Sequence, residues 1–354
     1  MIYVFFSNLE NRIGWKRGHS MKVLLYFEGE SLISSSGIGR DMKHQQQALD
    51  CVGIEWTCDP NDDYDILHIN TVGPNSLYMI KHARDMGRKV IYHAHSTEED
   101  FRNSFVFSNA IAPMFKKHLV NVYSQADYII TPTLYSKRLL EGYGISQPIE
   151  AISNGIDLQR FVYDSEKVKA FRRYFSLNEQ DKVVLCVGLF FERKGILDFV
   201  EVAKCLPEYK FVWFGAINGL MIPTQIREVI QGKHPSNVIF PGYVKGSILE
   251  GAFSGSDVFF FPSYEETEGI VVLEALASHQ NVIVRDIGVY DGWLLDGVNC
   301  YKGNDNADFV KLIRGIIEEK LPSLKEEGYK IAEQRSIEIV GRQLKAVYEK
   351  VMQL

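Results

Sequence analysis

The sequence predicts an α/β protein made of two doubly wound, Rossmann-like domains that face each other across a cleft. Short apolar runs, each typical of a buried parallel strand, alternate with helical patterns from residue 22 onward. A turn cluster at 153–157 separates two such series, and 354 residues exceed one comfortable hydrophobic core. We therefore expect an N-terminal domain over 1–160, with 1–20 as a possible extension, and a C-terminal domain over 161–354.

The expected elements follow one another in βα order, which places helices on both faces of parallel sheets. Each expected strand is a short apolar run, and each expected helix repeats apolar residues every three or four positions. The strands are expected at 22–27, 65–69, 89–94, 127–131, 149–152, 182–188, 210–214, 237–240, 257–261 and 281–285. The helices are expected at 39–52, 75–87, 111–125, 135–143, 164–175, 196–205, 223–231, 247–254, 270–278, 306–318 and 336–352.

Composition excludes several classes of protein. A net charge of −6 argues against general nucleic-acid binding. The sequence contains no run of 18 apolar residues that could span a membrane, and 1–20 lack a secretory signal. Five cysteines without a C-x-x-C pair suit a reduced cytosol without structural disulfides. We therefore expect a cytoplasmic globular protein.

The segment at 262–277 carries the most specific pattern in the chain. An apolar strand runs into a Pro-Ser turn, an acidic loop follows, and a glycine precedes the apolar start of a helix. Free backbone N–H groups at a helix start suit a phosphate, and flanking carboxylates suit sugar hydroxyl groups. The layout suits a nucleotide-sugar, although two glutamates alone are also typical of solvated helix-end charges. The candidate donor-binding residues here are Glu266, Gly269, Ile270, Val271 and Glu274.

A second motif lies at 184–195, where a strand ends at Gly188 and Gly195 opens a helix. Arg193 and Lys194 place two cations at the carboxyl end of that strand. Such cations suit a diphosphate leaving group, because they stabilise the charge that develops on it. The alternative is a solvated pair of loop charges.

The loop after the first strand, Ser34 to Arg40, contains Gly37 and Gly39 just before a helix. Two glycines let the backbone approach a ligand at the helix start, so Gly37 is a candidate binding residue. The pattern lacks the remaining glycine of a dinucleotide fingerprint, and a tight βα turn is the alternative.

His93 and His95 alternate on one face of the strand expected at 89–94, beside an acidic run at 98–100. A His-x-His pair beside carboxylates can bind a metal ion, and a lone histidine can also be a core residue. No further His or Cys cluster completes a metal shell in the sequence, so we expect no metal here.

The segment at 101–119 combines dense apolar positions with basic residues. Pro113 interrupts it, which predicts a helical pair or a bent helix. A basic and apolar surface helix suits a lipid headgroup layer, but core packing of a helix with exposed lysines fits equally well. The candidate membrane- and acceptor-contacting residues are Phe101, Arg102, Phe105, Lys116 and Lys117.

The Glu-x7-Glu spacing of Glu266 and Glu274, with a glycine three residues after the first, resembles the donor-site motif of retaining glycosyltransferases of the GT-B fold, glycosyltransferase family 4. The resemblance implies that Glu266 contacts the transferred sugar, Glu274 binds the ribose and His95 lies near the transferred sugar. It also implies that Gly37 faces the donor phosphate and that the last helix, 336–353, packs back on the first domain.

The second motif departs from that family in one position. The family usually shows Gly-Arg-Leu-x-x-x-Lys-Gly, and this chain keeps Gly188, Lys194 and Gly195 but has Leu189 where the arginine is expected. Arg193, next to the lysine, is the candidate replacement.

Three segments, His95 to Phe105, Phe191 to Gly195 and Glu265 to Glu274, together resemble the Gram-positive and mollicute glycolipid synthases. Those enzymes add a second hexose to monoglucosyl-diacylglycerol. The resemblance implies a UDP-hexose donor (UDP-glucose or UDP-galactose), a glycolipid acceptor, an anionic membrane surface as partner, and a peripheral position on the inner face of the plasma membrane. It implies transfer with retention of configuration by front-face attack, without metal or other cofactor.

The alternatives to a glycolipid acceptor are a soluble or polysaccharide acceptor and, from another class of enzyme, a UDP-sugar 2-epimerase. The implied catalytic residues are His95, Lys194 and Glu266.

Overall fold

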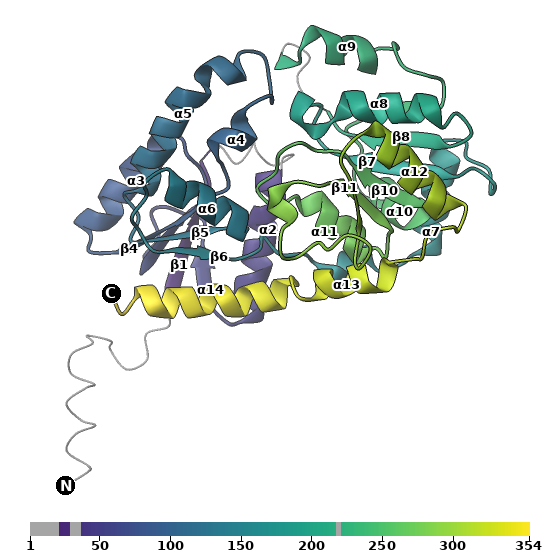
Figure 1. Ribbon diagram of the computed structural model, residues 1–354. Coiled ribbons are helices and arrows are strands. Elements are labelled where there is room, and N and C mark those ends of the chain that lie inside the picture. Colours follow the sequence, from purple (N-terminus) through teal and green to yellow (C-terminus); the bar gives the residue numbers. More distant parts are fainter. Residues whose placement is uncertain (1–20, 29–36, 217–220) are drawn as a thin grey trace.

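The computed structural model describes residues 21–28, 37–216 and 221–354 of the chain. Within these residues the chain forms two parallel sheets covered by helices, in two lobes that lie side by side (Figure 1). This arrangement confirms the predicted α/β class with two doubly wound units. The predicted extension at 1–20 and most of the glycine-containing loop before Gly37 lie outside the described residues.

The first sheet has the strand order β2-β1-β3-β4-β5-β6 in the described residues, and all neighbouring strands pair in parallel. Strands β3 and β5 are buried along their whole length, and apart from His68 and Thr131 their residues are apolar or aromatic. The strands are β1 (Lys22–Tyr26), β2 (Glu55–Thr57), β3 (Ile66–Ile69), β4 (Lys89–His93), β5 (Tyr128–Thr131) and β6 (Ile149–Ala151).

The second sheet has the order β12-β11-β10-β7-β8-β9, again with parallel pairing throughout the described residues. Its central strands β7 and β10 are entirely buried. The strands are β7 (Val183–Val187), β8 (Lys210–Phe214), β9 (Val238–Gly242), β10 (Val258–Phe261), β11 (Val282–Arg285) and β12 (Tyr301–Gly303).

Helices connect the strands, and several begin at a residue whose side chain caps the first turn. The oxygens of Thr97, Thr133 and Asp305 each accept a hydrogen bond from a first-turn N–H group, which fixes where the helix starts. The helices are α2 (Gly37–Cys51), α3 (Pro74–Asp85), α4 (Glu98–Phe101), α5 (Ser108–Tyr123), α6 (Leu134–Gly142), α7 (Ser165–Tyr174), α8 (Ile196–Cys205), α9 (Thr224–Ile230), α10 (Ser247–Gly255), α11 (Ile270–Ala277), α12 (Asn306–Ile317), α13 (Lys325–Glu333) and α14 (Ile337–Val351).

In each sheet the strand order reverses beside the first strand, between β1 and β3 and between β7 and β10. Ligands of doubly wound sheets bind at the carboxyl ends of the strands at such a switch point. The loops after β7 and β10 contain the two predicted donor motifs, so the topology brings 188–195 and 262–270 together.

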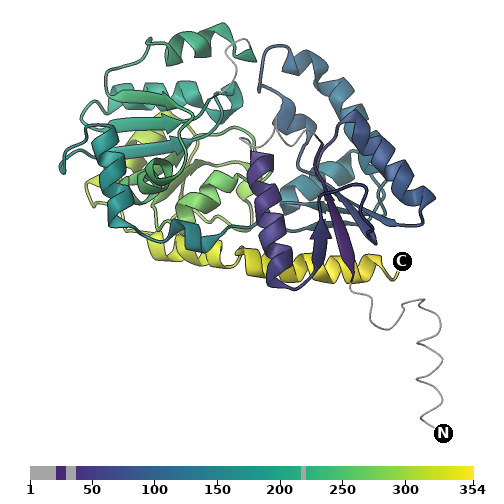
Figure 2. The same cartoon turned by 180° about the vertical axis from the view of Figure 1, so that it is seen from behind.

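Helix α13 lies beneath the second lobe, and α14 continues from it beneath the first lobe, as the front and back views show (Figures 1 and 2). The apolar residues of α14, including Leu344 and Tyr348, are buried with Val23 and Leu25 of β1. The predicted domain boundary at 160 falls within a short 3-10 helix and stays a prediction.

The structure also contains elements that the sequence pattern did not predict. Strands β2 (Glu-Trp-Thr) and β12 (Tyr-Lys-Gly) contain no apolar run that would mark a strand, and α4 and α13 were not expected. The predicted interruption at Pro113 is wrong, because Pro113 lies inside one continuous helix, α5, and the break that separates α5 from α4 falls at 102–107.

Candidate active site

A pocket opens between the two lobes at the switch point of the second sheet. One wall comes from the first lobe and carries His95, Ser96 and Asp100. The opposite wall comes from the second lobe, mainly from the loops after β7 and β10 and from the start of α11. The lining residues of this wall include Gly188, Leu189, Arg193, Lys194, Glu266, Gly269, Ile270 and Val271.

Lys194 and Glu266 form the charged centre of the second wall. The Lys194 Nζ atom contacts Glu266 Oε1, and the Ser263 hydroxyl group donates a hydrogen bond to the same oxygen at 2.7 Å. Burial by itself raises the pKa of Glu266, but the positive charges of Lys194 and Arg193 outweigh it and lower the pKa below its ordinary value. Glu266 is therefore ionised at neutral pH.

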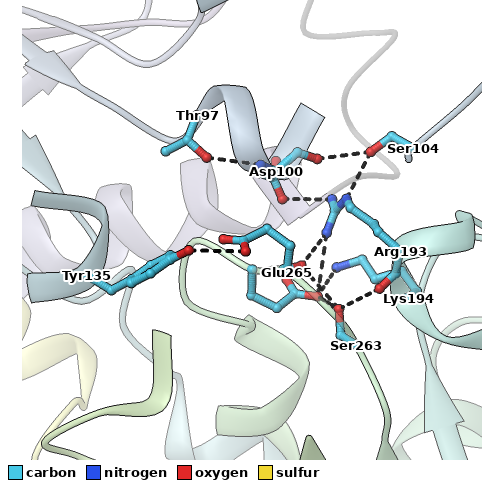
Figure 3. Close-up of polar contacts among 9 residues, drawn as sticks. Thr97, Asp100, Ser104, Tyr135, Arg193, Lys194, Ser263 and Glu265 are labelled. Atoms are coloured by element: carbon cyan, nitrogen blue, oxygen red, sulfur yellow. Dashed lines mark hydrogen bonds and ion pairs between the residues drawn. The ribbon is translucent and has the colours of Figure 1, made fainter. Parts of the chain in front are cut away.

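Arg193 joins the two lobes. Its guanidinium group is buried, with Nη2 2.8 Å from Asp100 Oδ1, while Nε donates to Ser104 Oγ at 2.9 Å. Figure 3 shows Asp100 and Ser104 reaching Arg193 from one side, with Lys194 and Ser263 on the other. Nη1 donates to a backbone carbonyl of the acidic loop at 2.7 Å. The predicted diphosphate contact of Arg193 stays a prediction.

Gly195 lets the loops after β7 and β10 touch. It has a φ of +77°, and a Cβ atom there would lie 2.4 Å from the Pro262 carbonyl oxygen. Both the backbone angle and the close approach require glycine. This contact is what sets Lys194 beside Glu266. Leu189, which stands where the resembling family has arginine, lines the pocket.

The start of α11 faces the pocket with backbone rather than side chains. Gly269 precedes the helix at a φ of +89°, and no side chain caps it. The first-turn N–H groups of Ile270 and Val271 have no acceptor among the described residues, which suits an anionic ligand. Glu274 is buried one turn deeper in the same helix. The predicted anion contacts of this helix start and the predicted ribose contact of Glu274 both stay predictions.

His95 is positioned by neutral partners. Its Nε2 atom lies 3.0 Å from Asn70 Oδ1, and the same oxygen accepts a hydrogen bond from Gln45 Nε2 at 2.6 Å. Because a carbonyl oxygen cannot donate, Nε2 of His95 carries the proton. Asn70 follows β3, so this contact lies at the switch point of the first sheet.

A stack of buried histidines lies behind His95. The ring centroids of His95 and His93 are 4.2 Å apart, and His68 stacks on His93 at 5.4 Å. His68 Nδ1 lies 2.6 Å from the hydroxyl group of Tyr348 on α14. Burial, and secondarily the nearby His95, lower the pKa of His68 to about 3. Burial, with His95 and His68 nearby, lowers the pKa of His93 well below its ordinary value, so His68 and His93 are uncharged at neutral pH.

Glu265 lies at the interface between the two lobes, called the seam below. Its Oε2 atom accepts a hydrogen bond from the Tyr135 hydroxyl group of α6 at 3.1 Å (Figure 3). Burial raises the pKa of Glu265 to about 7, and the nearby negative charges of Asp100 and Glu99 add to this effect. Two further contacts, from the Thr133 and Ser136 hydroxyl groups to a carbonyl of the acidic loop, close the same seam.

Four of the five predicted membrane-contacting residues have partners within the chain. Phe101 stacks on Phe115 and meets Phe105 edge to face. Arg102 and Lys116 both pair with Glu98. Lys117 is exposed. The most exposed apolar side chains of this region lie instead at the α5 start and along one face of that helix: Val106, Phe107, Ile111 and Met114.

The remaining predictions concern Gly37 and the metal. Helix α2 begins at Gly37. Across the described ranges, no three His, Cys, Asp or Glu side chains converge in the way a metal ion requires. In the same part of the chain, no helix is both long and apolar enough to cross a membrane.

Several residues of the site were not among the predicted ones. Asp100, Ser263 and Glu265 lie within segments whose acidic or turn character was visible in the sequence. Asn70 and Gln45 gave no signal, because a single amide in a helix or after a strand is common at any surface. Their role depends on contacts across 25 residues or more.

Two family models match the chain. The one described as Glycosyl transferases group 1 matches residues 167–335, and the one described as Glycosyltransferase Family 4 matches residues 55–160. The solved structure of Anabaena HepE in complex with UDP and glucose superposes with a TM-score of 0.74, covers 93% of this chain and 100% of that one, and is 16% identical. This likeness confirms the GT-B fold.

Two curated relatives cover most of the chain. A processive diacylglycerol alpha-glucosyltransferase of Acholeplasma laidlawii is 50% identical over 335 residues, which are 94% of this chain and 99% of that protein. An alpha-galactosylglucosyldiacylglycerol synthase of Streptococcus pneumoniae is 24% identical over 279 residues, 77% of this chain and 74% of that protein.

Proposed function

Because the chain belongs to the family 4 glycosyltransferases of the GT-B fold, and is therefore a sugar-transferring enzyme, we propose that it moves glucose or galactose from a UDP-sugar to monoglucosyl-diacylglycerol. The product is a diglycosyl-diacylglycerol. The observation that carries the proposal is the Lys194–Glu266 cluster beside the open start of α11, at the switch point of the second sheet. The names of the two curated relatives support a diacylglycerol-based acceptor.

The donor diphosphate binds at the first-turn N–H groups of α11, where Gly269, Ile270 and Val271 line the pocket. Lys194 stabilises the negative charge that develops on the diphosphate as the glycosidic bond breaks. Arg193, the preceding residue, adds to this stabilisation. Glu266 accepts hydrogen bonds from the transferred hexose through the oxygen that Lys194 and Ser263 do not use. Neither a metal nor another cofactor takes part in this proposal.

Retention of configuration proceeds by front-face attack. A carboxylate nucleophile attacks with an oxygen that carries much of the negative charge, whereas the charge of Glu266 is offset by Lys194, Arg193 and Ser263 and its other oxygen binds the hexose in this proposal. The acceptor hydroxyl group therefore attacks from the side of the leaving diphosphate, which takes its proton. His95, held in the Nε2–H form, orients the hexose.

The α5 stripe, defined as Val106, Phe107, Ile111 and Met114, docks on the inner face of the plasma membrane. Phe107 and Met114 are 76% and 67% exposed, which is unusual for large apolar side chains on one helix face. Exposed Lys117, further along the helix, matches an anionic lipid surface. A glycolipid acceptor stays in the bilayer, so its enzyme needs such a face next to the pocket.

The reaction is tested by incubating the protein with UDP-glucose or UDP-galactose and vesicles that contain monoglucosyl-diacylglycerol, followed by lipid chromatography. We expect a diglycosyl lipid from one of the two donors. Transfer to a soluble glycoside but not to the vesicles would replace the acceptor. Sugar release at the same rate with and without any acceptor would instead favour the 2-epimerase class.

Docking is tested by sedimentation with anionic vesicles at two salt concentrations. Lys117→Glu removes one attraction and adds one repulsion, about 2 kcal/mol or roughly thirtyfold in partitioning at low salt, and high salt removes most of the effect. Phe107→Ser should weaken binding by about 2 kcal/mol at both salts, because ring burial is not electrostatic. Tyr163→Ser is the matched control, since Tyr163 is 68% exposed on the other lobe. Equal losses for Tyr163→Ser and Phe107→Ser would refute docking through α5.

A further inference from the structure

Asp100 is one of two carboxylate residues that line the pocket, and it belongs to the first lobe. Its backbone is fixed twice: its N–H group donates to the Thr97 hydroxyl group at 3.1 Å, and its carbonyl accepts from the Ser104 hydroxyl group at 2.9 Å. Its Oδ1 atom lies 2.8 Å from Arg193 Nη2. Its Oδ2 atom makes no hydrogen bond or ion pair to any described residue, and the side chain is 22% exposed.

The other acidic groups nearby are already engaged. Glu266 shares Oε1 with Lys194 and Ser263. Glu265 turns to Tyr135, away from the lysine side of the cluster (Figure 3). Asp100 is thus the pocket carboxylate of the first lobe, held rigidly through one oxygen while the other is available to accept a hydrogen bond.

The chain leads directly from Asp100 to the α5 stripe. Helix α4, which contains Asp100, continues through a short loop to Val106 and Phe107, where the exposed apolar face begins. This loop is fastened to the second lobe, because the Asn103 carbonyl accepts from the Arg193 N–H group at 2.9 Å and the Val106 N–H group donates to the Met221 carbonyl at 3.1 Å. A glycolipid with its acyl chains at the stripe and its sugar in the pocket must pass this loop.

We propose that Asp100 binds a hydroxyl group of the acceptor sugar, which donates a hydrogen bond to Oδ2 while Oδ1 stays on Arg193. The inference rests on the proposed function, because it takes the acceptor to enter from the first lobe. The hydroxyl group keeps its proton in this contact, so Asp100 aligns the acceptor and does not deprotonate it. Arg193 serves as the positioning residue that holds the carboxylate across the lobes.

Asp100→Asn tests the contact, because an amide can keep the Arg193 contact through its oxygen but presents an N–H group where Oδ2 accepted. A hydrogen bond to a charged group corresponds to about tenfold to a hundredfold in affinity, so we expect the acceptor KM to rise by that factor. UDP affinity and the rate of UDP-sugar hydrolysis without acceptor should stay within about threefold of wild type.

Glu99→Gln is the matched control, since it removes the neighbouring carboxylate of α4, which is not among the residues that line the pocket, and its amide oxygen can still accept from the Tyr143 hydroxyl group. We expect its acceptor KM to change by less than about threefold. Asp100→Glu keeps a carboxylate and should retain more acceptor affinity than Asp100→Asn, which covers the case in which the Asn variant folds poorly.

Three results would overturn the inference: an unchanged acceptor KM in Asp100→Asn, an equal rise in Glu99→Gln, or a loss confined to donor affinity, which would place the hydroxyl group on the donor hexose. Failure of the proposed function looks different. If the wild-type protein uses a soluble glycoside and not the glycolipid, the same KM comparison on that glycoside still decides the role of Asp100.

Discussion

The two walls of the pocket are held together by different kinds of interaction. In the wall from the second lobe, buried opposite charges meet, with Lys194 and Arg193 beside Glu266. The wall from the first lobe also carries the carboxylate of Asp100, but around His95, in the part called the neutral wall below, neutral groups position the ring through an amide hydrogen bond and a ring stack. Breaking one partner of a buried ion pair costs about 3–5 kcal/mol, whereas a neutral hydrogen bond contributes about 1 kcal/mol. We therefore expect substitutions in the charged wall to have the larger effects.

The largest effect is expected for Lys194→Ala, in the charged wall. Loss of a group that stabilises charge in the transition state lowers kcat by about a hundredfold to a thousandfold. Glu274→Gln should instead raise the donor KM by about tenfold with kcat nearly unchanged, because a ribose contact is made equally in the ground and transition states. Steady-state kinetics with varied UDP-sugar separates the two. An intact kcat with a raised KM in Lys194→Ala would show that the lysine binds the donor without stabilising the leaving group.

His95→Ala tests the neutral wall at the residue that faces the pocket. We expect kcat to fall by about a hundredfold with little loss of stability, because His95 is half-buried and lines the pocket. His93→Ala should show the reverse, a fall of less than about tenfold in kcat but a loss of about 2 kcal/mol or more in the free energy of unfolding, since His93 is fully enclosed. Kinetics and urea unfolding of both variants check this. Equal kcat losses would mean that the stack, and not the His95 ring alone, matters for transfer.

The same difference between the walls explains what could be predicted from the sequence. The charged wall is built from two short loops, so Lys194, Gly195 and Glu266 appear as local motifs, and βα order alone places both loops at one sheet edge. The fold was predictable for the same reason, because short runs of buried apolar residues and periodic helices are local patterns. Strands β2 and β12 were not predictable, since their polar residues leave no apolar run in the sequence.

The neutral wall depends on contacts that no local pattern encodes. The His68–Tyr348 contact joins residues 280 positions apart, and Gln45 reaches His93 across 48. The sequence also could not show which side chains of 101–119 are exposed. It shows that the segment is apolar and basic, but only the structure shows that Phe101 and Phe105 contact each other while Phe107 is exposed.

Asn70→Ala removes the hydrogen-bond partner of His95 Nε2 but leaves His95 itself in place. It therefore measures how much the neutral hydrogen bond alone contributes to catalysis. We expect a fall of about tenfold in kcat, the size expected when one neutral hydrogen bond is lost, with the donor KM unchanged. Asn70→Asp keeps an acceptor oxygen and should restore most of kcat at neutral pH. It should also move the pH profile, since a carboxylate beside the ring favours the imidazolium form. If Asn70→Asp is as slow as Asn70→Ala with the same profile, Asn70 supports the fold and does not orient His95.

The smallest expected effect concerns Glu265, which lies between the two walls. Burial raises the pKa of this carboxyl from 4.5 to about 7 in the folded protein. The folded state therefore binds the proton more tightly than the unfolded state, so the group's contribution to stability is fully present below pH 4.5. It is lost as the pH rises through about 7. A shift of this size corresponds to about 3 kcal/mol at most, and solvent screening of a half-buried group reduces it to about 1–2 kcal/mol.

Glu265→Gln should remove that loss, because a glutamine cannot ionise and can still accept the hydrogen bond from Tyr135. We expect the variant to match wild type at pH 5 and to exceed it by about 1–2 kcal/mol at pH 8, measured as the free energy of unfolding in urea. Glu192→Gln, which removes an exposed carboxyl group from the loop after β7, is the control for the general loss of a negative charge. The same gain in both variants would mean that net charge, and not the buried seam between the lobes, sets the pH dependence. A gain in Glu265→Gln at pH 5 as well as at pH 8 would contradict the raised pKa, because a protonated glutamate and a glutamine present nearly the same group to Tyr135.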